Sequence, residues 1–301
     1  TPLSPAILYC DQRSTEEVAV IGERLPREKL QERTANQLVP GTCSITSLEW
    51  LRRHSPQIFE EATVFGHVST YLLKRLTGNW AIDRTNASLT GLMDLADPSG
   101  FSRDLCEVLE IPFGKLPPVL LSDRIVGELT EGAASVTGLP RGTVVVAGGG
   151  DAPVAAYGGG LRAEPEIFYS AGTTDCLMMV VDRPPPQPLF GNCAYCLDDR
   201  WISIGTMTSS GASVQWFIDN FLPRDATAAE MEMLAFGDGQ LPAPAEATFL
   251  PYLQGERTPI WDPTARGAFV GLSIGTDVGE LARSVFEGVA CGARQVVETL
   301  E

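Results

Sequence analysis

The sequence is poor in histidine, in basic residues and in long apolar runs. Its 301 residues include only two histidines, His54 and His67, whose spacing does not suit a metal site. No apolar run approaches the ~18 residues of a membrane span, and no signal peptide is recognisable. Lysine and arginine number 22 against 38 aspartates and glutamates, so the formal net charge is -16. Such acidity disfavours nucleic acid and anionic membranes as partners, although local dipoles can still bind a small anion.

The seven cysteines are dispersed along the chain. An odd, scattered set in a chain of this size favours reduced thiols and a cytoplasmic setting. Cys193 and Cys196 form a lone CxxC, but a metal site needs a second pair or nearby histidines. We therefore favour packing over redox or metal chemistry for this pair and predict no metal ligands in the chain.

The pattern of strands and helices predicts an α/β fold. A strand is expected over residues 6–10, followed by a helix capped at Ser14 or Thr15. Further helices are expected before Pro56, up to Gly78, and from a cap at Ser102. Turn residues at 138–142 and the buried strand after them predict a boundary. We expect one domain over 1–142 and a second over 143–301, with strands and helices mixed in layers.

Three glycines precede a lone acid in "VVVAGGGDAPVAAYGGG", residues 144–160. A strand that ends in glycines and Asp151 places a carboxylate beside backbone that a ligand can approach. Such an acid can take a proton from an attacking hydroxyl, although a glycine turn with a solvated aspartate remains the plainer alternative. The spacing does not fit the GxGxxG pattern of a dinucleotide-binding turn.

Two later segments suit phosphate oxygens. Gly172, Thr173 and Thr174 lie between two apolar runs, a pattern typical of a tight hairpin with outward amides and hydroxyls. Small residues around Gly211 open a helix that carries Gln215 one turn later, and helix N-termini favour anions. An ordinary hairpin and ordinary capping are the alternatives. Together with the acid, these segments indicate phosphoryl transfer, in which a protein mainly positions groups and balances charge.

The chain resembles the FGGY family of carbohydrate kinases, within the actin-like and hexokinase superfamily. The resemblance rests on "FLPYLQGERTPIWDPTARGAFVGL" at 249–272, on "ELARSVFEG" after it, on "RLTGNWAIDRTNASLTGLMDL" at 75–95, and on "PAILYCDQR" near the start. It covers nearly the whole chain and is closest to the xylulokinase branch. It implies two actin-like, ribonuclease H-like domains that flank a cleft, and a chain that is an internal portion of a longer protein.

The resemblance also implies an activity and roles for individual residues. The activity is ATP-dependent phosphorylation of a sugar or polyol hydroxyl, with Mg²⁺, on a ketopentose such as D-xylulose or on another family substrate such as glycerol, gluconate or ribulose. Asp151 matches the catalytic base. The residues that match nucleotide contacts are Gly172, Thr173, Thr174, Gly211 and Gln215. The residues that match substrate contacts are Asp11, Arg13, Asp151 and Ala152. A homodimer is left open, and Asp83 and Asn86 are interpreted first as structural.

Some positions depart from the family pattern. Ala152 stands where many members have Asn or Gln, so it cannot hydrogen-bond a sugar through its side chain. Ser47 stands where a lysine is usual, and Cys176 stands where glycerol kinases carry an aromatic residue. Ala152 and Ser47 keep open a second hypothesis, a kinase-like protein that holds sugar without turning it over. The charged loop Glu256–Arg266 is expected to hold itself together by charge-assisted hydrogen bonds rather than to touch substrate.

Overall fold

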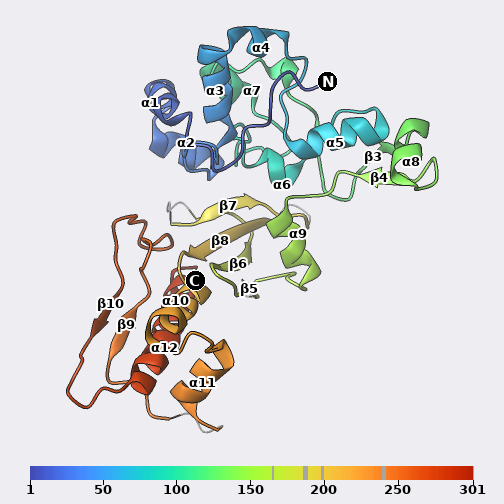
Figure 1. Ribbon diagram of the computed structural model, residues 1–301. Coiled ribbons are helices and arrows are strands. Elements are labelled where there is room, and N and C mark those ends of the chain that lie inside the picture. Colours follow the sequence, from blue (N-terminus) through green and yellow to red (C-terminus); the bar gives the residue numbers. More distant parts are fainter. Residues whose placement is uncertain (165, 186–188, 198–199, 239–241, 301) are drawn as a thin grey trace. The chain divides into compact units, whose positions relative to one another are not determined.

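The structure is a computed structural model that describes residues 1–301 apart from 165, 186–188, 198–199, 239–241 and 301 (Figure 1). Helices and strands are mixed along the chain, which confirms the predicted α/β class. The chain divides into two compact units, 1–166 with 180–203, and 167–179 with 204–301. Residues 143–166 thus fall in the first unit, although we expected the second domain to begin at 143. The predicted domain bounds stay a prediction.

The elements that open the first unit are mostly helices. Its N-terminal helices pack on a core that includes Ile21, Leu30, Ile45, Leu92 and Leu105, all at most 2% exposed. The first seven helices in chain order are α1 (Thr15–Arg24), α2 (Arg27–Thr34), α3 (Ser44–His54), α4 (Pro56–Glu61), α5 (Val68–Thr77), α6 (Arg84–Ala87) and α7 (Arg103–Val108). A 3-10 turn, η1 (Phe113–Lys115), follows.

Two short ladders complete the part of the first unit that leads to Asp151. Strands β1 (Ile82–Asp83) and β2 (Val119–Leu120) pair in parallel. Strands β3 (Ile125–Glu128) and β4 (Val144–Val146) pair antiparallel, and β3 contacts α5. Helix α8 (Glu131–Thr137) connects them, and α9 (Asp151–Gly158) follows β4. The chain therefore reaches Asp151 from a ladder that is anchored to α5.

The largest sheet has four strands in the order β5-β6-β8-β7. They are β5 (Ile167–Ser170), β6 (Asp175–Val181), β7 (Gly191–Ala194) and β8 (Trp201–Met207). β5 and β6 form the antiparallel hairpin predicted around 172–174, with Ser170 opposite Cys176. The division between the two units falls within β6 and within β8.

In the second unit, α10 (Gly211–Phe221) and α11 (Ala228–Phe236) pack with the long α12 (Val278–Leu300) and with the β9 (Thr248–Leu250) and β10 (Ala268–Val270) ladder (Figure 1). Phe217, Met231, Phe249 and Val285 are at most 1% exposed at the centre of this core. Burying side chains of this size stabilises the fold by ~1.5–3 kcal/mol each. This packing holds α10 against the rest of its unit.

Several local expectations are confirmed and two are not. Ser14 is the N-cap residue of α1, but its side chain makes no capping hydrogen bond. Gly78 ends α5 in the left-handed conformation, and the Ser102 hydroxyl caps α7 by accepting from the Leu105 amide. The strand expected over residues 6–10 does not form: residues 8–11 make a turn in which the Asp11 amide donates to the Leu8 carbonyl. An apolar run becomes a strand only where a partner takes its backbone hydrogen bonds, and no ladder among the described residues includes this segment.

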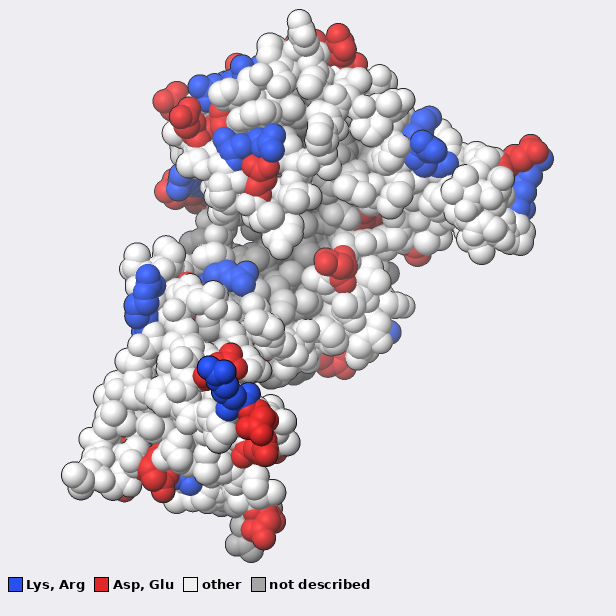
Figure 2. Space-filling view, in the orientation of Figure 1, with Lys and Arg blue, Asp and Glu red and all other residues white. Residues whose placement is uncertain are grey.

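Acidic and basic side chains lie in small mixed groups on the face shown in Figure 2, and no broad basic patch is visible on that face. Separately, Arg24 and Arg52 both pair with the buried Glu49, with Arg24 Nη1 2.8 Å from Glu49 Oε2. In the described part of the chain, no helix has both the length and the apolar content that a membrane crossing needs.

Candidate active-site residues

Asp151 is the first residue of α9 (Asp151–Gly158), and it is exposed to solvent. β4 ends at Val146, so the acid lies beyond a four-residue turn and not directly at the end of the strand as we expected. The Ala152 amide donates to Asp151 Oδ1 at 2.8 Å, and the helix N-terminus favours negative charge at this position. The carboxylate is therefore held by one oxygen, while its residue stays open to solvent.

The glycine turn before Asp151 packs closely on other parts of the first unit. The Gly148 amide donates to the Ser122 carbonyl at 3.0 Å, and Gly148 has φ of 76°, which favours glycine. A Cβ on Gly149 would come 3.0 Å from a methyl of Val154. The Gly150 amide donates to Thr85 Oγ1 at 2.7 Å. We expected these glycines to leave room for a ligand, but in the structure they also allow the chain to approach itself.

Helix α9 is held along its length as well. The Tyr195 hydroxyl donates to the Leu161 carbonyl at 2.8 Å just past the helix, and Cys196 Sγ lies 3.5 Å from the Pro153 carbonyl. Burial raises the pKa of Tyr195 to about 12 and also raises the pKa of Cys196. Cys193, the other member of the CxxC, is buried and forms no disulfide in the described part of the chain. Both cysteines thus take part in the packing of the first unit, as we favoured.

Asp11 and Arg13 bind each other. Arg13 Nη2 lies 2.7 Å from Asp11 Oδ2, and the Arg13 guanidinium stacks 4.9 Å from the Trp50 ring. The hydrogen bonds from Arg13 lower the pKa of Asp11. This pair and Ala152, whose methyl group offers no hydrogen bond, stay predicted substrate contacts. A sugar hydroxyl that binds Asp11 must share its oxygens with Arg13.

The β5–β6 hairpin is fixed by a buried acid that we did not single out from the sequence. Asp175 is 2% exposed, its Oδ1 accepts from the Gly172 amide at 3.1 Å, and its Oδ2 accepts from the Tyr169 hydroxyl. Burial and then this hydrogen bond raise the pKa of Tyr169. An aspartate directly after a Gly-Thr-Thr turn, at the start of an apolar strand, is the signal that could have identified it.

The hairpin docks on the start of α10. The Gly211 amide donates to the Gly172 carbonyl at 2.9 Å and the Ala212 amide donates to the Thr173 carbonyl at 3.1 Å. We expected the first amides of this helix to face an anion, but these two bind the hairpin. A Cβ on Gly211 would lie 2.4 Å from the Gly172 oxygen, a contact that side chains do not make. Gly211 therefore permits the close approach of hairpin and helix.

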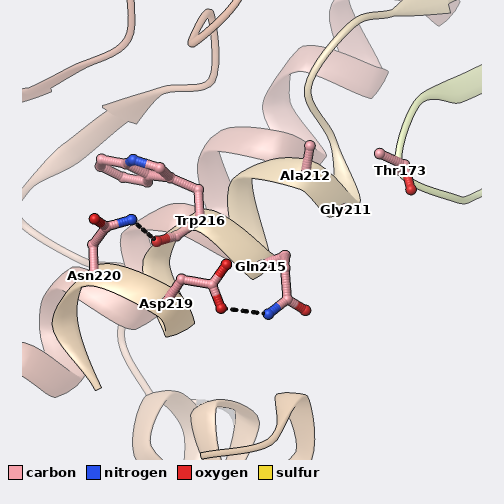
Figure 3. A pocket seen from close by; sticks show the side chains of 7 residues that line it. All are labelled: Thr173, Gly211, Ala212, Gln215, Trp216, Asp219 and Asn220. Carbon is pink, nitrogen blue, oxygen red and sulfur yellow. Dashed lines mark hydrogen bonds between the residues drawn. The ribbon is translucent and has the colours of Figure 1, made fainter. Parts of the chain in front are cut away.

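A pocket of about 490 Å³ lies beside this junction (Figure 3). Its lining contains three predicted nucleotide contacts, and the full set is Thr173, Gly211, Ala212, Gln215, Trp216, Asp219 and Asn220. The side-chain amide of Gln215 donates from Nε2 to Asp219 Oδ1 at 2.8 Å, and the two side chains point toward each other in Figure 3. We missed Trp216, Asp219 and Asn220. The spacing of four residues from Gln215 to Asp219 and from Trp216 to Asn220, which brings side chains together on a helix, could have indicated them.

The remaining predicted hairpin residues support this pocket from outside its lining. Thr174 Oγ1 lies 3.4 Å from the Thr208 carbonyl, in the segment that leads into α10.

The charged loop 256–266 is held by hydrogen bonds to its carboxylates. Glu256, 5% exposed, accepts from the Thr208 amide at 2.8 Å and from the Arg257 amide at 2.7 Å. Asp262 accepts from the Thr264 hydroxyl and from the Thr264 amide, and these two bonds lower the pKa of Asp262. The charge-assisted hydrogen bonds expected in this loop are thus present, with backbone amides among the partners, and the expectation that the loop does not touch substrate stays a prediction.

The chain matches two domain models. The N-terminal domain of the FGGY family of carbohydrate kinases matches residues 1–158, and the C-terminal domain of the same family matches residues 167–301. Together these matches extend over nearly the entire sequence, as the sequence resemblance implied.

The chain is similar to named kinases of more than one substrate. It is 31% identical over 290 residues to xylulose kinase of Escherichia coli (strain K12), covering 95% of this chain and 58% of that one. It is 31% identical over 310 residues to glycerol kinase of Nocardia farcinica (strain IFM 10152), covering 99% and 60%. The crystal structure of xylulose kinase from Rhodospirillum rubrum superposes with a TM-score of 0.86 at 28% identity, covering 96% and 58%. The chain therefore spans about three fifths of the length of these relatives. The chain belongs to the FGGY family of carbohydrate kinases.

Proposed function

We propose that the protein containing this chain transfers the γ-phosphoryl group of ATP to a hydroxyl of a sugar or polyol. The observation that carries the proposal is the docking of the 172–174 hairpin on the first turn of α10, beside a pocket lined by Thr173 and Gln215. Phosphoryl transfer needs positioned groups and balanced charge more than covalent chemistry. A rigid hairpin with a hydroxyl next to a hollow that accommodates part of a nucleotide fits that need.

In this proposal, the pocket in the second unit receives ATP, which enters as its Mg²⁺ complex. Gln215 and Thr173 offer polar groups to the nucleotide, and Trp216 offers an apolar surface. The hairpin is held from within by Asp175 and from behind by α10. Because both supports act on the backbone, the hairpin can meet phosphate oxygens without a reorganisation that would cost binding energy.

Asp151 acts as the general base on the acceptor hydroxyl. Its carboxylate is fixed by the Ala152 amide through one oxygen, and the second oxygen is the one we assign to the substrate proton. The helix N-terminus keeps negative charge favourable there before the proton is taken. The proton moves to Asp151 as the acceptor oxygen forms its bond to phosphorus and the bond to the ADP oxygen breaks.

D-Xylulose is our first choice of acceptor, because it follows from the sequence resemblance to the xylulokinase branch. The equal identities to a xylulose kinase and a glycerol kinase do not separate the two substrates. Gluconate and ribulose stay as alternatives. A pocket that hydrogen-bonds a particular hydroxyl can discriminate strongly between such substrates. The assignment of the substrate therefore depends on measured turnover and not on sequence identity to relatives. No disulfide joins the cysteines of the described residues, in agreement with the cytoplasmic setting that we propose.

The test is ADP release by the full-length protein with D-xylulose, D-ribulose, glycerol and gluconate. We expect one of these to be turned over best. In that assay Asp151→Asn should lower kcat by about 10²–10⁴-fold, the usual contribution of a general base, with sugar binding by calorimetry nearly unchanged. Asp225→Asn, the same change at another exposed acid, is the matched control.

Two results separate the alternatives. Turnover by Asp151→Asn close to that of Asp225→Asn contradicts the assignment of the base. Sugar binding without ADP release from the wild type, for every acceptor, supports instead the second hypothesis, a kinase-like protein that holds sugar without turning it over.

A further inference from the structure

A buried polar cluster in the first unit connects the segment 83–86 to the turn that carries Asp151. Asp83 is 0% exposed and Thr85 is 1% exposed, and they lie at the end of β1 and the start of α6. Thr85 Oγ1 accepts from the Gly150 amide at 2.7 Å. Because Gly150 is the N-cap of α9 and directly precedes Asp151, this hydroxyl is one residue from the proposed base.

The direction of the Thr85 hydroxyl is fixed by Asp83. The hydroxyl donates its only hydrogen to Asp83 Oδ1, so that a lone pair faces the Gly150 amide. Asp83 is fixed in turn by the backbone amide of Asn86 at 2.9 Å and by its side-chain amide at 2.7 Å. A chain of oriented hydrogen bonds, built on the buried side chains of Asp83 and Thr85, therefore ends on the Gly150 amide. Hydrogen bonds that are shielded from solvent are stronger than those in water.

The bond matters because of the residue that it restrains. Glycine has more backbone freedom than any other residue, and three glycines in succession precede Asp151. The Gly148 amide is held by the Ser122 carbonyl, but Gly150 is held by the Thr85 side chain. Without that side chain, the Gly150 amide loses its anchor while the Gly150 carbonyl still accepts from the Val154 amide at 3.1 Å, so the turn can shift and move the carboxylate that follows it. A displacement of about 1 Å at a reacting group can cost about 10²-fold in rate.

We propose that Thr85, oriented by Asp83, is a positioning residue for Asp151: it restrains the N-cap of α9 and so holds the carboxylate in the place from which it takes the substrate proton. This inference depends on the proposed function, since it assigns Thr85 a role through the base. It extends the interpretation of Asp83 and Asn86 as structural residues, because the structure that they build ends at the proposed catalytic group.

Thr85→Val in the full-length protein removes the hydroxyl and keeps the shape of the side chain. We expect kcat with the best acceptor to fall about 10- to 100-fold while KM for ATP changes less than about twofold. Thr85→Ser, which keeps the oxygen, should recover most of the loss. Thr90→Val is the matched control, because Thr90 is buried and its hydroxyl likewise donates one hydrogen bond, to the Ala87 carbonyl, and accepts one, from the Leu92 amide.

Two further measurements distinguish positioning from general destabilisation. Added to Asp151→Asn, Thr85→Val should lower kcat no further, because residues that act as a unit are not additive. Amide hydrogen exchange at Gly150 should become faster in Thr85→Val and stay slow in Thr85→Ser and Thr90→Val. The exchange measurement needs no kinase activity, so it tests the hydrogen bond even if the assignment of the base fails.

Each outcome decides something. An equal loss of kcat in Thr85→Val and Thr90→Val, or the same factor of loss in the wild-type and Asp151→Asn backgrounds, overturns the positioning role. Full turnover of Thr85→Val beside an inactive Asp151→Asn overturns this inference alone and leaves the proposed function standing. Wild-type turnover of Asp151→Asn refutes the proposed base and this inference together.

Discussion

Gly211→Ala is the most direct test of how the hairpin and α10 cooperate. The added methyl carbon would lie 2.4 Å from the Gly172 oxygen and 3.0 Å from the Gly172 carbonyl carbon. Both contacts are with backbone, which cannot rotate out of the way as a flexible side chain can. The hairpin must therefore shift relative to the helix or the helix must lose its first turn.

The size of the effect follows from the contacts at stake. If the hairpin moves, the bonds from the Gly211 and Ala212 amides are weakened, and each contributes about 0.5–1.5 kcal/mol. If it stays, the overlap costs about 1–3 kcal/mol, as overpacking does elsewhere. Alanine returns up to about 1 kcal/mol through its better helix propensity. We expect a net loss of about 1–2 kcal/mol in the free energy of unfolding.

The assay has two readouts on the full-length protein. A loss of 1–2 kcal/mol should lower Tm by roughly 2–8 °C for a domain of this size. Displacement of Thr173 should also raise the Kd for ATP about tenfold, which corresponds to ~1.4 kcal/mol. Gly132→Ala in the first turn of α8 is the control, since a Cβ there meets nothing within 4 Å and should leave stability equal or slightly higher. If Gly211→Ala matches this control in Tm and binds ATP as the wild type does, the proposed coupling of hairpin and helix is wrong.

Two other predictions concern buried titratable groups. Cys43 and Cys106 are two of the three buried cysteines, and Cys10 and Cys291 are exposed. Burial raises the pKa of Cys43 to about 12 and that of Cys106 to about 11, so iodoacetamide at pH 8 should label the exposed pair first by mass spectrometry; early labelling of Cys43 would contradict its burial. Burial raises the pKa of Tyr195 to about 12, above the usual tyrosine pKa of ~10. The buried neutral phenol should therefore contribute stability that is complete below pH ~10 and is lost as the pH rises toward 12. In urea titrations Tyr195→Phe should lose about 1 kcal/mol at neutral pH and show less of this alkaline loss than the exposed control Tyr9→Phe; identical pH profiles would refute the account.

Local sequence patterns predicted much of the fold because local contacts determine those features. The helix end at Gly78 and the cap at Ser102 each depend on one side chain and its nearest backbone. The β5–β6 hairpin follows from two apolar runs around a Gly-Thr-Thr turn. The strand expected over 6–10 failed for the opposite reason, since pairing depends on residues far along the chain.

The site was predictable as a set of segments but not as a set of contacts. Sequence spacing indicated the acid at 151, the hairpin and the start of α10, and these include three residues that line the pocket. It did not reveal that the first amides of α10 bind the hairpin, nor that Asp175 closes the hairpin from inside. Those contacts join residues whose types are common in turns and caps, so their composition carried no signal of the partner.

Two glycines of these segments share one physical role that bears on how variants should be interpreted. An added Cβ would lie 2.4 Å from the Gly172 oxygen at Gly211 and 3.0 Å from a methyl of Val154 at Gly149. In both cases the glycine allows two parts of the chain to meet closely next to a proposed functional group. Substitutions at these glycines should therefore reduce rate and stability together, because they move the supporting backbone. Asp151→Asn should reduce rate while stability is kept, because the carboxylate is exposed and makes few contacts. A comparison of these two classes of variant separates the residues that support the chemistry from the one we assign to carry it.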